Sequence, residues 1–121
     1  MTRLVSNETG LHFQVAALLR IHARDDVLYF HPANGGLRDK IVAARLQRMG
    51  VIPGVSDFVI FVDLILHFLE LKFGKNGLSP AQKNWKEKAE KAGAHFHIAR
   101  TLDEVVEILN SIGALKSKVT T

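Results

Sequence analysis

The apolar stretch from Pro53 to Lys72 is the strongest constraint on the fold. It carries Asp57 near one end and both Glu70 and Lys72 at the other. Charged groups at the margins of a core segment are costly to bury unless they are paired or bind a metal. We interpret the stretch as a β-hairpin whose turn is centred on Asp63-Leu64, a pair that lacks the Gly or Asn typical of a tight turn.

The position of the turn determines which charged residues meet. If Val62 lies opposite Ile65, then Asp57 lies opposite Glu70, with Cβ atoms about 5 Å apart. Two carboxylates this close repel each other unless a cation lies between them. Lys72 is two residues beyond Glu70, so it points to the same face. The alternatives are a one-residue slip, which separates the two acids, or a plain ion pair at a sheet edge.

Composition limits the class of protein. The chain has 121 residues, 47% of them hydrophobic and none of them cysteine. One domain with one core is therefore expected, without disulfides or cysteine-ligated zinc. The apolar run from Phe58 to Leu69 is shorter than the roughly 20 residues that span a bilayer, and the N-terminus lacks an apolar leader. We therefore expect a cytoplasmic protein. The net charge of +4 is a mild indication of a polyanionic partner.

Periodicity and capping residues predict a single α/β domain, in the order α-β-α-β-β-α-β-α. Because both faces of the hairpin are apolar, we expect a mixed sheet with helices on both faces. Residues 1–113 form the domain, and residues 114–121 are expected to be a flexible tail. The other predicted elements are a helix capped by Ser6 that ends near Ala23, a strand at 27–31, a helix at 37–49 with Ile41, Ala44 and Leu46 or Met49 inward, a helix at 80–92 capped by Ser79, a strand at 96–99, and a helix from Thr101 to Ile112.

Several short motifs occur in a characteristic order. They are Asn34-Gly35-Gly36, Ala43-Ala44, Met49-Gly50, Pro53 to Asp57, Glu70-Leu71-Lys72, Leu78 to Gln82, Trp85 and Gly93. In this order and spacing they resemble the VRR-NUC domain, a virus-type replication-repair nuclease module of the PD-(D/E)XK superfamily. The resemblance covers nearly the whole chain, from about Glu8 to Leu109. One departure is Ser56, where the family usually has proline.

The resemblance implies a restriction-endonuclease-like core and a DNA endonuclease that depends on Mg²⁺ or Mn²⁺. It also implies a homodimer that acts on branched DNA, as in phage and bacterial members. Asp57, Glu70, the backbone carbonyl of Leu71 and Glu8 would be the metal ligands. Lys72 would orient or help to deprotonate the attacking water, and Gln82 would reach the site or the DNA backbone.

Phosphate contacts are expected from five residues: Asn34, Arg38, Lys75, Lys83 and Lys86. Three residues also have structural interpretations: Gln82 completes a capping box, Glu8 suits the dipole of a helix start, and Trp85 suits a core or dimer contact. The six histidines show no zinc-motif spacing. Two other functions remain open: a non-catalytic DNA-binding or dimerisation module, and a nuclease that works only within a replication complex.

Overall fold

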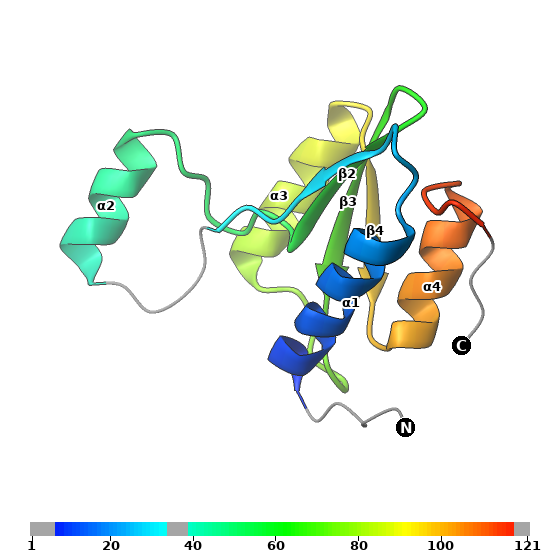
Figure 1. The fold of residues 1–121 in the computed structure, drawn as a ribbon. Coiled ribbons are helices and arrows are strands. Elements are labelled where there is room, and N and C mark those ends of the chain that lie inside the picture. Colours follow the sequence, from blue (N-terminus) through cyan, green and yellow to red (C-terminus); the bar gives the residue numbers. More distant parts are fainter. Residues whose placement is uncertain (1–6, 34–38, 118–121) are drawn as a thin grey trace.

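The computed structural model describes residues 7–33 and 39–117 (Figure 1). Its elements follow the predicted order, in one small α/β domain with a mixed sheet. They are α1 (Glu8–His22), β1 (Leu28–Phe30), α2 (Lys40–Arg48), β2 (Phe58–Val62), β3 (Ile65–Leu71), α3 (Pro80–Lys91), β4 (His95–Ala99) and α4 (Leu102–Ser111). None of the helices in these ranges is long and apolar enough to cross a membrane.

The four strands form one sheet in the order β1-β2-β3-β4. β1 and β3 flank β2 as antiparallel partners, whereas β4 runs parallel to β3 after the α3 crossover. Val62 pairs with Ile65 and Phe58 with Leu69, so the predicted register is confirmed. Asp57 therefore precedes β2 at the level of Glu70.

The hairpin turn adopts a conformation that its sequence does not favour. Asp63 and Leu64 both have positive φ values, 50° and 66°, which are strained for residues with a Cβ. The guanidinium of Arg24 holds the Asp63 carboxylate through contacts of 3.2 and 3.4 Å. Burial of the flanking strands thus sets the register, and a tertiary ion pair assists the turn.

The hydrophobic core lies on one face of the sheet, beneath α1 and α4 (Figure 1). It includes Leu11, Val15, Leu19, Phe58, Ile60, Val62, Leu69, Leu71, Val105 and Leu109. The other face is covered by α3, where Trp85 meets Phe68 edge to face at 5.0 Å. Helices on both faces were predicted, but on this second side the cover is partial: Leu28, Phe30 and Phe61 remain exposed.

The predicted inward face of α2 is wrong. The helix has no buried residue, and Ile41 and Met49 are 75% and 74% exposed. In the described part of the chain, α2 packs against no other helix or strand, and Figure 1 shows it standing apart from the body. Its apolar spacing was correctly recognised as helical, but no helix or strand among residues 7–33 and 39–117 covers that side.

The flexible tail expected from Ala114 is wrong for its first residues. Ala114 and Leu115 are buried. The Arg24 amide donates a hydrogen bond to the Ala114 carbonyl, and the Lys116 amide donates one to the His22 carbonyl. A short bridge between Ala23 and Leu115 fastens the segment after α4 to the end of α1. Apolar burial at Ala114 and Leu115 thus outweighs the fraying expected at a chain terminus. Residues 118–121 lie outside the described part.

Three histidines cluster where β3 and β4 run side by side. The Nδ1 of buried His67 lies 2.9 Å from the Nε2 of His97, and the His67 ring is 5.1 Å from that of His95. Burial lowers the pKa of His67 to about 4, and the nearby His97 and His95 add to this effect. Burial likewise lowers the pKa of His97. His67 and His97 therefore form a hydrogen-bonded pair within the packing, and their lowered pKa values favour the neutral form at pH 7.

We expect His67 to make folding sensitive to acid. The pKa of the folded state lies below the unfolded value near 6.5, so the unfolded chain binds more protons between these values. The stabilising contribution is present above pH 6.5 and is lost as the pH falls towards 4, by about 2 kcal/mol. Urea unfolding from pH 7 to 4.5 should show a shallower decline for His67→Leu than for the wild type. Equal declines would contradict this assignment.

Gly54 fixes the segment that leads into β2. Its φ is +84°, and a Cβ there would lie 2.4 Å from the backbone carbonyl carbon and oxygen of Ala81. Gly50 has a similar φ of +106° but no atom within 4 Å. We expect Gly50→Ala to cost about 1 kcal/mol for its conformation alone, and Gly54→Ala about 2 kcal/mol more because backbone must move. Chemical denaturation of the two variants measures the difference; equal losses would contradict the close approach.

Candidate active site

Asp57 is fixed at the entrance to β2 by backbone contacts on both sides. Its Oδ2 accepts a hydrogen bond of 2.7 Å from the Leu71 amide on β3. Its carbonyl oxygen lies 2.6 Å from Nδ1 of His31, and because a carbonyl only accepts, that nitrogen carries the proton. The predicted proximity of the two strand ends is therefore realised through the Asp57 side chain.

Glu70 occupies the end of β3 with only 3% of its surface exposed. One oxygen, Oε2, accepts a bond of 3.3 Å from the Gln82 amide, whereas the buried Oε1 has no donor among the described residues. Burial, and after it the nearby Asp57 carboxylate, raise the pKa of Glu70 to about 8. A buried oxygen without a partner marks a place where a cation would be stabilising.

Lys72 and Glu70 are joined through one amide. Lys72 as a whole is 9% exposed. Its Nζ donates a hydrogen bond of 2.8 Å to Oε1 of Gln82, and Nε2 of Gln82 donates to Glu70. The same Oε1 accepts from the Ser79 amide, which completes the capping box of α3. Both interpretations of Gln82 are thus compatible, because the cap holds the side chain where it contacts Glu70 and Lys72.

Glu8 connects α1 to the end of β3. It lies in the first turn of the helix, as predicted, with Asn7 as the N-cap, while Ser6 lies outside the described residues. Its Oε1 accepts 3.1 Å from the Phe73 amide, one residue beyond Lys72. Glu8 contributes to the electrostatic effect on the pKa of Glu70, so α1 brings a third carboxylate to this end of the sheet.

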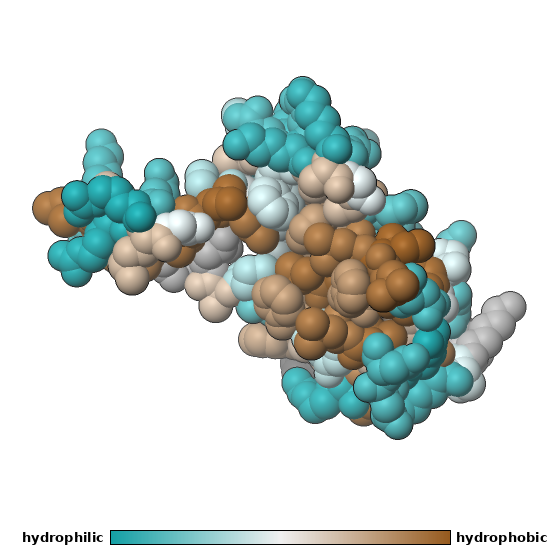
Figure 2. Space-filling model, turned by 90° about the horizontal axis from the view of Figure 1, so that it is seen from above, coloured by the Kyte–Doolittle hydropathy of each residue, from teal (hydrophilic) through white to brown (hydrophobic). Residues whose placement is uncertain are grey.

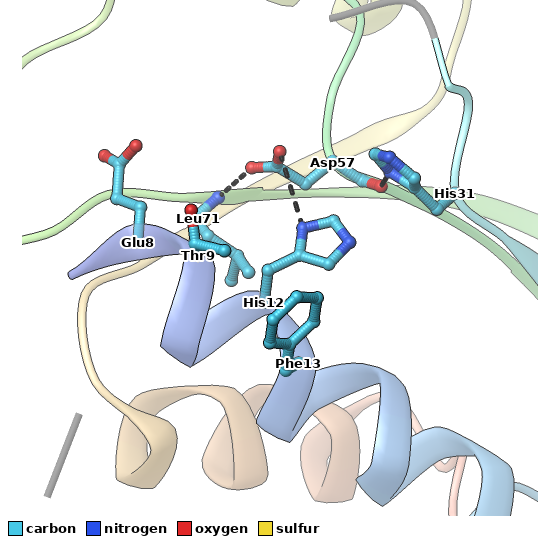
Figure 3. Close-up of a pocket in the computed structure, with 7 residues that line it drawn as sticks. All are labelled: Glu8, Thr9, His12, Phe13, His31, Asp57 and Leu71. Carbon is cyan, nitrogen blue, oxygen red and sulfur yellow. Dashed lines mark hydrogen bonds and ion pairs between the residues drawn. The ribbon is translucent and has the colours of Figure 1, made fainter. Parts of the chain in front are cut away.

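A hollow of about 400 Å³ opens beside Asp57 (Figure 3). Figure 3 shows Asp57 between His31 and Leu71, with the His12 ring approaching from α1. Nδ1 of His12 lies 3.9 Å from Oδ1 of Asp57. The pKa of His12 is lowered mainly by burial and, to a smaller extent, by the neighbouring His31. The hollow is lined by Glu8, Thr9, His12, Phe13, His31, Asp57 and Leu71.

The two histidines of this hollow were missed by sequence reasoning, which took them as ordinary half-buried or surface residues. One usable signal was present: His12 is four residues after Glu8, so both lie on one side of a helix. His31 carried no local signal, because its place depends on the pairing of β1 with β2.

The donor set fits a hard divalent cation. Within residues 7–33 and 39–117, no group of three or more His, Asp or Glu side chains is arranged to hold a metal. Mg²⁺ requires fewer, since it binds through one or two carboxylates and keeps several waters. Asp57, the unpaired oxygen of Glu70 and the Leu71 carbonyl would all offer oxygen atoms to such an ion. Without soft or nitrogen donors in this set, the chemistry favours Mg²⁺ or Mn²⁺ over zinc.

The residues predicted to contact phosphates divide into three groups. Lys75, in the connection after β3, and Lys83, in the first turns of α3, are exposed at the end of the sheet that holds the acids. Lys86 is engaged elsewhere, with Nζ 2.9 Å from Glu90 and 5.8 Å from the centre of the Phe96 ring. Asn34 and Arg38 lie outside the described residues.

Comparison with known proteins locates the fold. No family model matches the chain, and no curated protein matches it. A solved structure described as a VRR_NUC domain protein is similar with a TM-score of 0.73 and 21% identity, over 91% of this chain and 90% of that one. At this identity the likeness concerns the fold: the chain has the fold of a VRR-NUC domain, as its motifs predicted.

Proposed function

We propose that this protein is a divalent-metal-dependent nuclease that hydrolyses phosphodiester bonds in DNA. The observation that carries the proposal is the meeting of Asp57, Glu70 and Lys72 at one end of the hairpin, with a buried oxygen of Glu70 left without a donor. The VRR_NUC neighbour supports a nuclease-type fold. A plain ion pair at a sheet edge is less consistent with this site, because Glu70 and Lys72 are both buried.

Asp57, Glu70 and the Leu71 carbonyl would hold Mg²⁺ or Mn²⁺, with Glu8 holding a second ion or a metal-bound water. When bound, the cation would supply a more acidic water and charge neutralisation at the phosphate. The chain itself fixes these oxygens before any substrate arrives: the Leu71 amide orients Asp57, and the Phe73 amide orients Glu8. Such preorganisation reduces the reorganisation needed during the reaction.

Lys72 would orient the attacking water and stabilise negative charge that develops on the phosphate. Its ammonium group donates to Gln82, and Gln82 is held by the cap of α3, so the ammonium group of Lys72 has a fixed position. Exposed Lys75 and Lys83 would bind neighbouring phosphates, which positions the strand and carries little sequence information. From the VRR-NUC resemblance we further propose that the protein acts as a homodimer on branched DNA.

Replacing the central residues should abolish cleavage. With Mn²⁺, we expect Asp57→Asn and Lys72→Met each to slow cleavage of linear, flapped or four-way-junction DNA by about 100-fold or more. Asp63→Asn is a matched control for Asp57, since it removes a carboxylate at the opposite end of the same hairpin and Asn tolerates a positive φ. Lys91→Met is the control for Lys72, because Lys91 is an exposed residue in the last turn of α3.

The outcomes separate the candidate functions. Folded Asp57 and Lys72 variants that cleave as the wild type does would refute this site. A wild-type protein that binds DNA with steep salt dependence, yet cleaves nothing with either metal, would indicate the non-catalytic binding module instead. Cleavage that appears only with a helicase or polymerase would indicate a nuclease of a larger complex.

Glu70→Gln should separate metal binding from catalysis. Because the pKa of Glu70 is raised to about 8, folding at neutral pH must protonate this buried carboxyl; Gln avoids that cost, so the metal-free variant should be about 1 kcal/mol more stable than the wild type. Mn²⁺ should raise the melting temperature of the wild type and leave that of the variant nearly unchanged. Glu87→Gln, at an exposed residue, is the control and should respond to Mn²⁺ as the wild type does. An equal shift in Glu70→Gln would exclude Glu70 as a ligand.

A further inference from the structure

The isolated helix α2 carries an apolar stripe without a covering surface in its own chain. Val42, Leu46 and Met49 follow one another at helical spacing, and Ile41 flanks them. Val42 and Met49 are exposed, and Leu46 is only half-buried. A helix of nine residues is marginal in water, since most helical stability comes from packing an apolar side. We therefore expect α2 to pack against a protein surface.

The body of the molecule has a groove of matching character. It lies between the hairpin and α3, measures about 560 Å³, and is lined mainly by apolar residues: Phe61, Leu64, Ile65, Leu66, Phe68, Trp85, Ala89 and Ala92. Leu64 beside it is 89% exposed, and Figure 2 shows apolar surface gathered on the body seen from above, with α2 apart from it. An amphipathic helix in such a groove is a common mode of recognition.

The dimensions agree with this pairing. A nine-residue helix is about 14 Å long, and the part of β3 that lines the groove, residues 65–68, extends about 13 Å. The groove is bordered on its open side by exposed Leu28 and Phe30 of β1, the edge strand beside β2. One helix would therefore cover much of the apolar face that α3 leaves bare.

The groove of the same chain is poorly placed for this helix. We call the segment 39–53, which carries α2, the arm. Gly54 directly after it is seated on the backbone of Ala81 at the start of α3, so the arm ends at the end of the sheet that holds the acids. Between Arg48 and Gly54 there are few residues to carry the helix back, and the groove lies towards the hairpin tip, at the opposite end of β2. In the structure the arm extends away from the body (Figure 1).

We propose that two copies of this chain exchange these arms, so that α2 of each packs into the hairpin–α3 groove of the other. The inference rests on the homodimer of the proposed function and assigns its interface. Reciprocal exchange covers both the stripe and the groove on each copy, and it closes with two-fold symmetry, so neither of these two surfaces is left to recruit further copies.

Light scattering with size-exclusion chromatography tests the assembly. The wild type should have twice the chain mass, and Val42→Asp with Met49→Asp should weaken association about 30-fold or more, because charges would enter an apolar interface. Lys40→Asp with Gln47→Asp places two charges on the opposite side of the same helix and should leave the dimer intact. A monomeric wild type, or a stripe variant that remains dimeric, would overturn the proposal.

Disulfide trapping identifies the contact, because the natural chain has no cysteine. Met49→Cys protein mixed with Phe61→Cys protein should give, on oxidation, a disulfide-linked dimer containing one of each. A mixture of Met49→Cys and Asp103→Cys proteins is the control. It should give little mixed dimer, since Asp103 is an exposed residue of α4, away from the groove. A chain carrying both Met49→Cys and Phe61→Cys that yields only internally linked monomer would overturn the exchange.

The two proposals can fail separately. A dimer trapped through Met49→Cys and Phe61→Cys that cleaves no DNA would leave the arm exchange standing and refute the nuclease. An active protein that is monomeric at all concentrations would overturn the exchange and leave the site in place.

Discussion

The carboxylate of Glu70 is buried in a position where its charge is poorly compensated, and the neighbouring structure is arranged around it. Only one of its oxygens receives a hydrogen bond, and that bond comes from Gln82. Lys72 lies nearby, but its Nζ donates to Oε1 of the Gln82 amide, while Nε2 of the same amide donates to Glu70. The amide therefore links a buried acid and a buried cation, and the capping box of α3 fixes its position. Such a network needs stability from elsewhere, because a charge at this depth opposes folding.

That stability comes from the two strands that carry the site and from the helices behind them. Phe58, Leu69 and Leu71 are almost fully buried beside the acids, so the pairing of β2 with β3 cannot slip without exposing the core. Gly54 adds a second restraint by seating the chain before Asp57 on the start of α3. The same contact brings together the segment before β2 and the helix that supplies Gln82. Asp57, Glu70 and Gln82 are thus positioned by packing rather than by attraction among themselves.

Sequence reasoning reached most of this geometry because the relevant signals are local or periodic. The hairpin register follows from which side chains of Phe58–Leu71 must be buried, and it holds although Asp63-Leu64 is a poor turn. The capping box of Ser79 and Gln82 could be predicted from a local pattern of four residues. By contrast, His12 and His31 enter the hollow because α1 and β1 pack beside Asp57; the spacing from Glu8 could have indicated His12, but no local signal indicates His31. The burial of Ala114 and Leu115 is likewise a tertiary effect, since it depends on the end of α1.

The inward face predicted for α2 was wrong for a related reason. Its spacing shows that one side is apolar, but periodicity cannot say which molecule supplies the surface opposite. The sheet presents a comparable situation, because α3 covers Phe68 through Trp85 while Phe61 and Leu28 stay exposed on the same side. A buried sheet face and a stable short helix are each expected from their residues, and within this chain neither is complete. The same physical rule that placed the core correctly therefore supports the proposal that a second copy covers α2 and this part of the sheet.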